Sequence, residues 1–274
     1  MSPHHPRPPG RTTVPRDRDT PTVLHDSFLV RENRVLDVDG HIDRMVASSG
    51  WPRTAFLPLY ENLLRAAAAS PGWSFPLVTL REGQLTYKLR PLSPDALRTT
   101  VTVWTPEEPD SRRVPWHKGP EFPLQTSLQR QAKSHGAEEA LMIGADGILR
   151  EGAYSSVVHW VDGALVVSSA PQRLPSVTES AVVRAAISSG YPVMRRPCGP
   201  REVRAADEVW TLSSLHGIRV VTAWDGEPVS EAGIAAEFRE HLQTFEQDVA
   251  MWLVASPSTA SPEQREAREY KDGK

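Results

Sequence analysis

Apolar and polar residues alternate with a period of two along much of the N-terminal part of the chain, which is typical of half-buried strands. The alternation in 23–39 continues on both sides of the polar stretch 31–34 and predicts a hairpin. The stretch 75–92 alternates around Glu82 and Gly83, which predicts a second hairpin, and 99–105 predicts a further strand. Between the hairpins, apolar residues at helical spacing predict two helices, in "GHIDRMVASSGW" and in "AFLPLYENLLRAAAAS".

A polar segment with three prolines, 106–115, precedes a second pattern and is the expected domain boundary. A helix is expected over 124–136, a capped amphipathic helix after Ser176 or Thr178, and one long final helix over 233–254. Short strands are expected between these helices, at 139–144, 147–152, 155–161, 164–169, 208–212 and 218–226. These elements predict a mixed α/β (α+β) protein of two unequal lobes, a smaller N-terminal domain over 22–111 and a larger domain over 112–255.

The composition limits the classes of partner. The proline-rich segment 1–21 and the polar segment 256–274 hold too few apolar side chains to fold, so both are expected to be disordered tails. The net charge of −3 argues against nucleic acid or an anionic membrane as the main partner. No apolar run is long enough to span a bilayer and no signal-peptide pattern is present, so a cytoplasmic protein is expected.

Common sequence motifs of catalysis are missing. There is no P-loop, no Gly-x-Gly-x-x-Gly after a strand and no Gly-x-Ser-x-Gly. Cys198 is the only cysteine, which excludes a disulfide framework, and the histidine spacing predicts no metal site. Two isolated charges remain, Lys118 in "HKGPEF" and Glu151 in "LREGAYSS". Each taken alone is typical of a solvated surface charge.

Four blocks in order change that interpretation. They are Lys118 itself, "GAEEALMIGADGILREGAYSS" at 136–156, "LPSVTES" at 174–180 and "AADEVWTLSSLHGIRVV" at 205–221. Together they resemble the C-terminal lobe of the class IV pyridoxal-phosphate enzymes, which include branched-chain and D-amino-acid aminotransferases and aminodeoxychorismate lyase. "GHIDRM" also resembles the "HLxRL" of that family. The resemblance implies a two-lobed fold-type-IV architecture with pyridoxal 5′-phosphate between the lobes, and a homodimer that acts on a small molecule.

The resemblance also implies a role for individual residues. Lys118 is expected to form the Schiff base with the cofactor and to carry protons during catalysis. Glu151 is expected to keep the pyridine nitrogen protonated. The remaining cofactor-binding residues are expected at the 5′-phosphate, and they are Arg44, Val177, Thr178, Ser214 and Leu215. The plain alternatives are a surface charge for Arg44, a helix cap for Thr178 and a turn residue for Ser214.

Several positions differ from the family pattern. "VLHDSFLV" stands where the family has "YGDGxFET", and Phe122 stands where aminotransferases often place a tyrosine. Ser156 replaces an asparagine, Ser176 a glycine, and Glu179 an arginine, which places a carboxylate near the expected phosphate site. The block "SSLHGIRVV" is more similar to the lyase branch.

Three functions are therefore considered. The first is a class IV aminotransferase acting on a small amino acid or keto acid through the Lys118 Schiff base. The second is an enzyme similar to 4-amino-4-deoxychorismate lyase that releases pyruvate. The third is a degenerate homologue that binds a ligand without chemistry.

Overall fold

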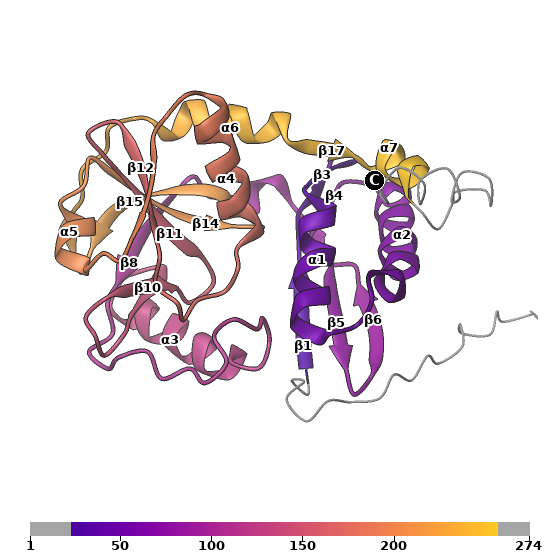
Figure 1. The fold of residues 1–274 in the computed structure, drawn as a ribbon, viewed down its shortest axis with the longest axis horizontal. Helices are drawn as coiled ribbons and strands as arrows, with labels where there is room; N and C mark the ends of the chain where they lie inside the picture. Colours follow the sequence, from indigo (N-terminus) through magenta and orange to yellow (C-terminus); the bar gives the residue numbers. More distant parts are fainter. Residues whose placement is uncertain (1–22, 257–274) are drawn as a thin grey trace, which may run out of the picture.

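The computed structural model describes residues 23–256, so the expected tail at 1–21 and, apart from Ser256, the expected tail at 256–274 lie outside the described residues. Two lobes stand side by side in Figure 1, and strands and helices mix in both. The larger lobe carries most of the later part of the chain, whereas the last helix returns to the smaller lobe. The mixed α/β fold with two unequal lobes is therefore confirmed.

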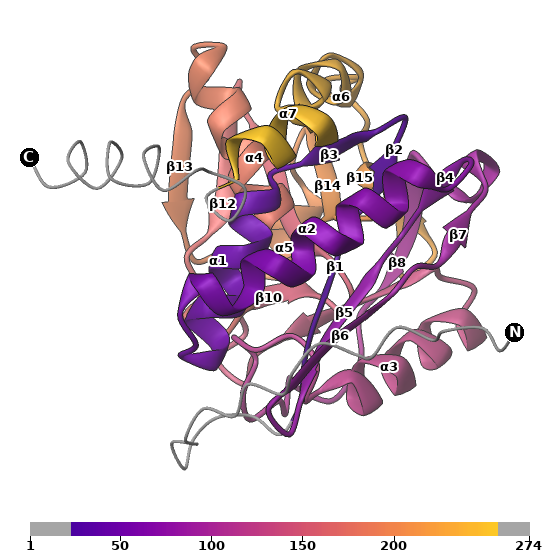
Figure 2. The same cartoon turned by 90° about the vertical axis from the view of Figure 1, so that its right-hand side faces the viewer.

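In the small lobe, helices α1 (Val38–Ser49) and α2 (Arg53–Ala69) pack on an antiparallel sheet, as Figure 2 shows. The sheet has the order β1-β5-β6, with β1 at Val23–Ser27, β5 at Leu77–Arg81 and β6 at Gln84–Lys88. Its core is apolar and aromatic, because Phe28, Ile42, Phe56 and Tyr60 are all fully buried there. Burial of such side chains is the main source of the lobe's stability.

The predicted hairpin at 31–34 is present but short, because it joins only β2 (Val30–Arg31) and β3 (Arg34–Leu36). Glu32 and Asn33 form its turn with φ values of 50° and 58°, the left-handed geometry of a two-residue hairpin. The expectation that 23–27 belongs to the same hairpin is wrong, since β1 pairs with β5. The second predicted hairpin, β5 with β6, is confirmed.

The large lobe is built on a nine-stranded sheet with the order β10-β9-β8-β15-β14-β11-β12-β13 and with β16 beside β15. The strands are β8 Thr100–Trp104, β9 Glu139–Ile143, β10 Leu149–Gly152, β11 Ser156–Val161, β12 Ala164–Ser168, β13 Val193–Arg196, β14 Glu208–Ser213, β15 Gly217–Trp224 and β16 Glu227–Pro228. The helices are α3 Phe122–Ser134, α4 Val177–Ser188, α5 Pro200–Arg204 and α6 Ala235–Thr244. All strands predicted between 139 and 226 are thus found.

Strand pairing crosses the boundary that the sequence suggests between 111 and 112. β8 lies before that boundary, yet it runs parallel to β9 and β15 in the large sheet. The division of the chain into 22–111 and 112–255 stays a prediction. Within the part of the chain that the structure describes, no helix combines the length and apolarity that a bilayer crossing needs.

The expected single helix over 233–254 is wrong. After α6, the short strand β17 (Glu246–Asp248) pairs with β3 of the small lobe, and α7 (Val249–Ala255) follows. Glu246 accepts hydrogen bonds from Arg31 at 2.7 and 3.1 Å, and Asp248 caps α7 by accepting one from the Met251 N–H at 3.0 Å. The long-range strand pairing outweighs the local helical pattern and ties the end of the chain to the small lobe.

Candidate active site

A cavity opens where the lobes meet. Arg44 of α1 lines it from the small lobe, and the loop before α3, the β10–β11 turn, the start of α4 and the β14–β15 turn line it from the large lobe. The lining side chains that bear on chemistry are Arg44, His117, Lys118, Phe122, Glu151, Tyr154, Ser155, Ser156, Ser176 and Ser214. Lys118 and Glu151 therefore share one cavity.

Lys118 lies in the loop that precedes α3, and its carbonyl accepts a hydrogen bond from the His25 N–H at 2.7 Å. Gly119 follows at φ 131°, and a Cβ there would lie 3.0 Å from the His25 ring, so only glycine fits this reversal. Burial, together with the Arg44 charge, lowers the pKa of Lys118 to about 8, against the opposing effect of Asp26. Among residues 23–256, no side chain accepts a hydrogen bond from the amine. It is therefore free to react.

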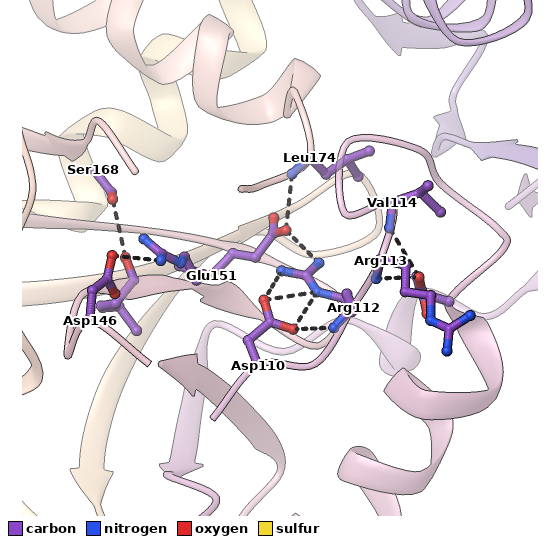
Figure 3. A network of polar contacts seen from close by, with 11 residues as sticks. Asp110, Arg112, Arg113, Val114, Asp146, Glu151, Ser168 and Leu174 are labelled. Carbon is purple, nitrogen blue, oxygen red and sulfur yellow. Dashed lines mark hydrogen bonds and ion pairs between the residues drawn. The ribbon is translucent and has the colours of Figure 1, made fainter. Parts of the chain in front are cut away.

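Glu151 lies on β10 in a network that Figure 3 shows. One oxygen, Oε1, accepts hydrogen bonds from Arg112 Nη1 at 2.7 Å and from the Leu174 N–H at 2.9 Å. Asp110 holds the other edge of the Arg112 guanidinium, with Oδ2 2.8 Å from Nη2. Burial raises the pKa of Glu151 to about 7, against the opposing effect of Arg112. Oε2 accepts no hydrogen bond from the described residues, so this oxygen is free to bind a ligand in the cavity.

The turn between β10 and β11 is fixed by a buried ion pair behind it. Glu139 accepts hydrogen bonds from Arg219 Nη2 and from the Tyr154 N–H, both at 3.0 Å. Gly152 allows the tight turn, since a Cβ there would lie 2.3 Å from Ser155 Oγ. Ser155 and Ser156 line the cavity, and both side chains are buried. The Ser155 hydroxyl opposes the rise that burial causes in the pKa of Glu139, and the Ser156 hydroxyl does the same for Glu179.

Arg44 is not the surface charge that its helix position suggests, because it is only 8% exposed. It binds the buried Asp26 of β1, which also accepts hydrogen bonds from His41 Nδ1 at 2.9 Å and from Tyr60 at 3.1 Å. Burial favours protonation of Asp26, but Arg44 and His41 hold the pKa of that carboxyl well below its usual range. Arg44 Nη1 also donates to the Pro175 carbonyl at 3.2 Å and thus links the two lobes. The role of Asp26 was not predicted from the sequence.

The residues expected at the cofactor phosphate do not all line one cavity. Ser176 caps α4 by accepting a hydrogen bond from the Glu179 N–H at 3.2 Å, so it fills the capping role considered for it or Thr178. Ser214 lines the cavity that contains Lys118, and it also lines an adjoining cavity with Thr178 and Leu215. Val177 lies in an outer groove beside Arg44 and Ser176. Their part in cofactor binding stays a prediction.

Glu179 is turned toward Arg173, and the two side chains form an ion pair with each 10% exposed. Arg173 Nη1 also donates to the Ser168 carbonyl at 2.6 Å, which fixes the guanidinium. Burial raises the pKa of Glu179, and Arg173 opposes the rise. The carboxylate that replaces the family's arginine is thus compensated by a cation from the preceding loop.

Phe122 packs its ring against two neighbours at the mouth of the cavity. It stacks on His25 with ring centroids 5.1 Å apart and meets Tyr154 edge-on at 6.2 Å. Tyr154 is 44% exposed, and its hydroxyl lies 2.7 Å from Thr126 Oγ1. Tyr154 therefore supplies a phenol hydroxyl beside the cavity, although Phe122 has no hydroxyl.

Comparison with known proteins agrees with this geometry. Residues 24–224 match the family model described as amino-transferase class IV. The branched-chain-amino-acid aminotransferase of Escherichia coli (strain K12) is 24% identical over 146 residues, which are 53% of this chain and 47% of that relative. The match thus spans about half the length of the relative.

Solved structures show the same fold. A hypothetical aminotransferase from Mycobacterium tuberculosis in its PLP-bound form has a TM-score of 0.69 and 20% identity, covering 81% of this chain and 88% of that one. A Legionella pneumophila protein provisionally described as a 4-amino-4-deoxychorismate lyase has a TM-score of 0.72 and 17% identity, covering 82% and 91%. The family model spans well over half of the sequence, so the chain belongs to the class IV aminotransferase family.

Proposed function

We propose that this protein is a pyridoxal-phosphate-dependent aminotransferase that acts on a small amino acid or keto acid. The observation that carries the proposal is the shared cavity of Lys118 and Glu151, one an amine of lowered pKa and the other a buried carboxylate with one oxygen free. Pyridoxal phosphate needs an amine of this kind and a carboxylate of this kind at opposite ends of its ring. The homodimer stays a prediction from the family resemblance, and the cytoplasmic location stays a prediction from the sequence.

The donor set fits the cofactor. Lys118 would hold its aldehyde carbon, Glu151 Oε2 its ring nitrogen, and the start of α4 its phosphate, with Arg44 and Ser214 nearby. The helix start supplies backbone N–H groups, and Arg44 Nε is buried without a partner among the described residues. When bound, the cofactor supplies an electron-accepting ring that stabilises negative charge on the substrate's α-carbon.

The protein side chains then move and hold protons. Because the pKa of Lys118 is about 8, roughly a tenth of the amine is neutral at pH 7, far more than for an ordinary lysine, and this form is able to accept a proton from the α-carbon. The Arg112 pair orients Glu151 and favours its ionised form, which stabilises a protonated ring nitrogen. Asp110 holds Arg112 in turn, so the orientation does not depend on solvent.

A second candidate is a lyase that releases pyruvate from a substrate such as 4-amino-4-deoxychorismate. It is favoured by Phe122, which puts a ring without a hydroxyl at the cavity, and by the turn that contains Ser214 and Leu215. The same Lys118 and Glu151 would serve both reactions. The third possibility, a degenerate homologue, is disfavoured because both residues are present and share the cavity.

The two reactions are separated by their products. The protein loaded with pyridoxal phosphate is incubated with a panel of small amino acids, with and without keto-acid acceptors, and with 4-amino-4-deoxychorismate. Transfer of the amino group to the acceptor supports the aminotransferase, whereas pyruvate without an acceptor supports the lyase. Lys118→Ala is expected to abolish either activity. Equal activity of wild type and Lys118→Ala would overturn both.

A further inference from the structure

Three metal-ligating side chains converge away from the cavity of Lys118. His159 of β11, Cys198 of the loop before α5 and Glu202 of α5 offer ligand atoms that all lie within 4.8 Å of one another. The three residues come from different elements, and His159 is 39 positions from Cys198 in the sequence. The histidine spacing therefore gave no indication of the cluster.

His159 occupies an unusual place for an imidazole. It is 3% exposed, and its Nε2 has no hydrogen-bond partner among residues 23–256. Its neighbours two positions away on β11, Val157 and Val161, pack in an apolar cluster with Cys198 and Val203. A buried ring nitrogen without a partner costs free energy, so a ligand at this position would stabilise the fold.

We propose that His159, Cys198 and Glu202 form a binding site for a divalent cation of the zinc class. Imidazole nitrogen, thiolate sulfur and carboxylate oxygen are the three ligand types that Zn²⁺ takes in proteins. With bonds of about 2.0–2.3 Å, tetrahedral ligands lie roughly 3.3–3.8 Å apart, so the cluster needs to contract by only about 1 Å. Glu202 is exposed, which leaves a path for the ion and room for water as the fourth ligand.

Arg196 on β13 controls access to the site. Its Nη1 donates a hydrogen bond to Cys198 Sγ at 3.3 Å, and its Nη2 forms an ion pair with Glu202. The Arg196 side chain is 39% exposed, so it has room to swing into solvent. Metal binding would thus exchange a guanidinium for a metal ion and release the Cys198 thiol proton to water.

The site would join α5 to the large sheet. The Cys198 carbonyl accepts a hydrogen bond from the Leu149 N–H of β10 at 2.9 Å, and His159 lies on β11, which pairs with β12 and β14. A metal held by His159, Cys198 and Glu202 would clamp the helix to two strands. Its expected effect is therefore on stability, and the reaction at Lys118 does not require it.

The test is titration of the purified full chain with Zn²⁺ by calorimetry and with Co²⁺ by absorption. Wild type is expected to bind one ion per chain, with a thiolate-to-cobalt charge-transfer band and a higher Tm with Zn²⁺. His159→Asn, Cys198→Ser and Glu202→Gln are each expected to weaken binding at least about tenfold, because each removes one ligand.

Two further variants complete the experiment. Arg196→Met removes the competing cation and is expected to tighten binding, a gain that a misfolded protein would not show. His241→Asn removes a histidine outside the cluster, 38% exposed beside Glu237, and is expected to bind like wild type. The proposal is overturned if wild type binds no ion, if the three ligand variants bind as wild type does, or if Arg196→Met has no effect.

Discussion

Arg112 and Glu151 form a buried ion pair at the wall of the cavity, with Nη1 2.7 Å from Oε1 and the side chains only 1% and 5% exposed. Arg112 is fixed in turn by Asp110, so two charges from a polar linker set the direction of one carboxylate on a strand. One oxygen of Glu151 is held by Arg112 and by the Leu174 N–H, which leaves the other oxygen without a partner among the described residues.

Arg112→Met is expected to lower the free energy of unfolding by about 3–5 kcal/mol, because it leaves buried carboxylates without their cation. It also raises the pKa of Glu151 above about 7, since the Arg112 charge now opposes that rise. The affinity for pyridoxal phosphate should fall, because Glu151 is then less often ionised. Urea denaturation measures the loss of stability, and cofactor titration measures the loss of affinity. Arg113→Met is the matched control: its side chain is exposed, so a change within about 0.5 kcal/mol is expected. Equal effects of the two variants would contradict this role of Arg112.

The raised pKa of Glu151 predicts a pH-dependent stability of the cofactor-free protein. The unfolded carboxyl ionises near 4.5 and the folded one near 7, so the folded state binds more protons between these values. Stability from this group is present below 4.5 and is lost as pH rises through 7, by roughly 3 kcal/mol. Glu151→Gln has no carboxyl to ionise and should not show this loss. Denaturation at several pH values should give a smaller decline in the free energy of unfolding between pH 4.5 and 7 for Glu151→Gln than for wild type. Parallel curves would refute the raised pKa of Glu151.

The charge of Arg44 predicts the reactivity of Lys118. Arg44 lowers the pKa of the amine, so Arg44→Met is expected to raise it above about 8, toward 10.5. Arg44→Lys keeps the charge and should leave the value near that of wild type. The measurement is the pH dependence of labelling of Lys118 by a small aldehyde and a reductant in cofactor-free protein, read by mass spectrometry. Identical profiles for Arg44→Met and Arg44→Lys would contradict the electrostatic cause.

The ion pair of Arg173 and Glu179 predicts an asymmetry between two variants. Arg173→Met leaves a nearly buried carboxylate at the start of α4, whereas Glu179→Gln leaves a cation in the preceding loop. Both variants lose the ion pair, but only Arg173→Met leaves an uncompensated carboxylate, Glu179, that repels a phosphate dianion. Its affinity for pyridoxal phosphate should fall at least about tenfold further than that of Glu179→Gln. Calorimetric titration with pyridoxal phosphate measures both affinities. A lower affinity for Glu179→Gln than for Arg173→Met would contradict a phosphate site at the start of α4.

The strands of the large sheet and the Lys118–Glu151 relationship were predictable because both rest on local pattern and on motif order. The roles of Asp110, Arg112 and Asp26 were not. Asp110 and Arg112 stand in a stretch whose polar composition is typical of a linker, and Asp26 is one of several polar residues in a short strand. Their function depends on partners far away in sequence, such as Glu151 and Arg44.

The structure of the last described residues was also not predictable from local pattern. Residues 233–254 keep a helical pattern throughout, and nothing local indicates the break at β17. The break arises because β3 offers an open edge to Glu246, Gln247 and Asp248. β8 likewise belongs to the large sheet because it pairs in parallel with β9 and β15, which both follow it in the sequence. The hydrophobic pattern of a strand does not indicate which distant strand it pairs with.

The most direct measurement is the location of the cofactor. The protein is loaded with pyridoxal phosphate, reduced with borohydride, digested and mapped by mass spectrometry. We expect a single modified peptide that carries the reduced cofactor on Lys118, and no modification in Lys118→Ala. Label on another lysine, or no label in a protein that has taken up the cofactor, would contradict the assignment of Lys118 as the Schiff-base residue.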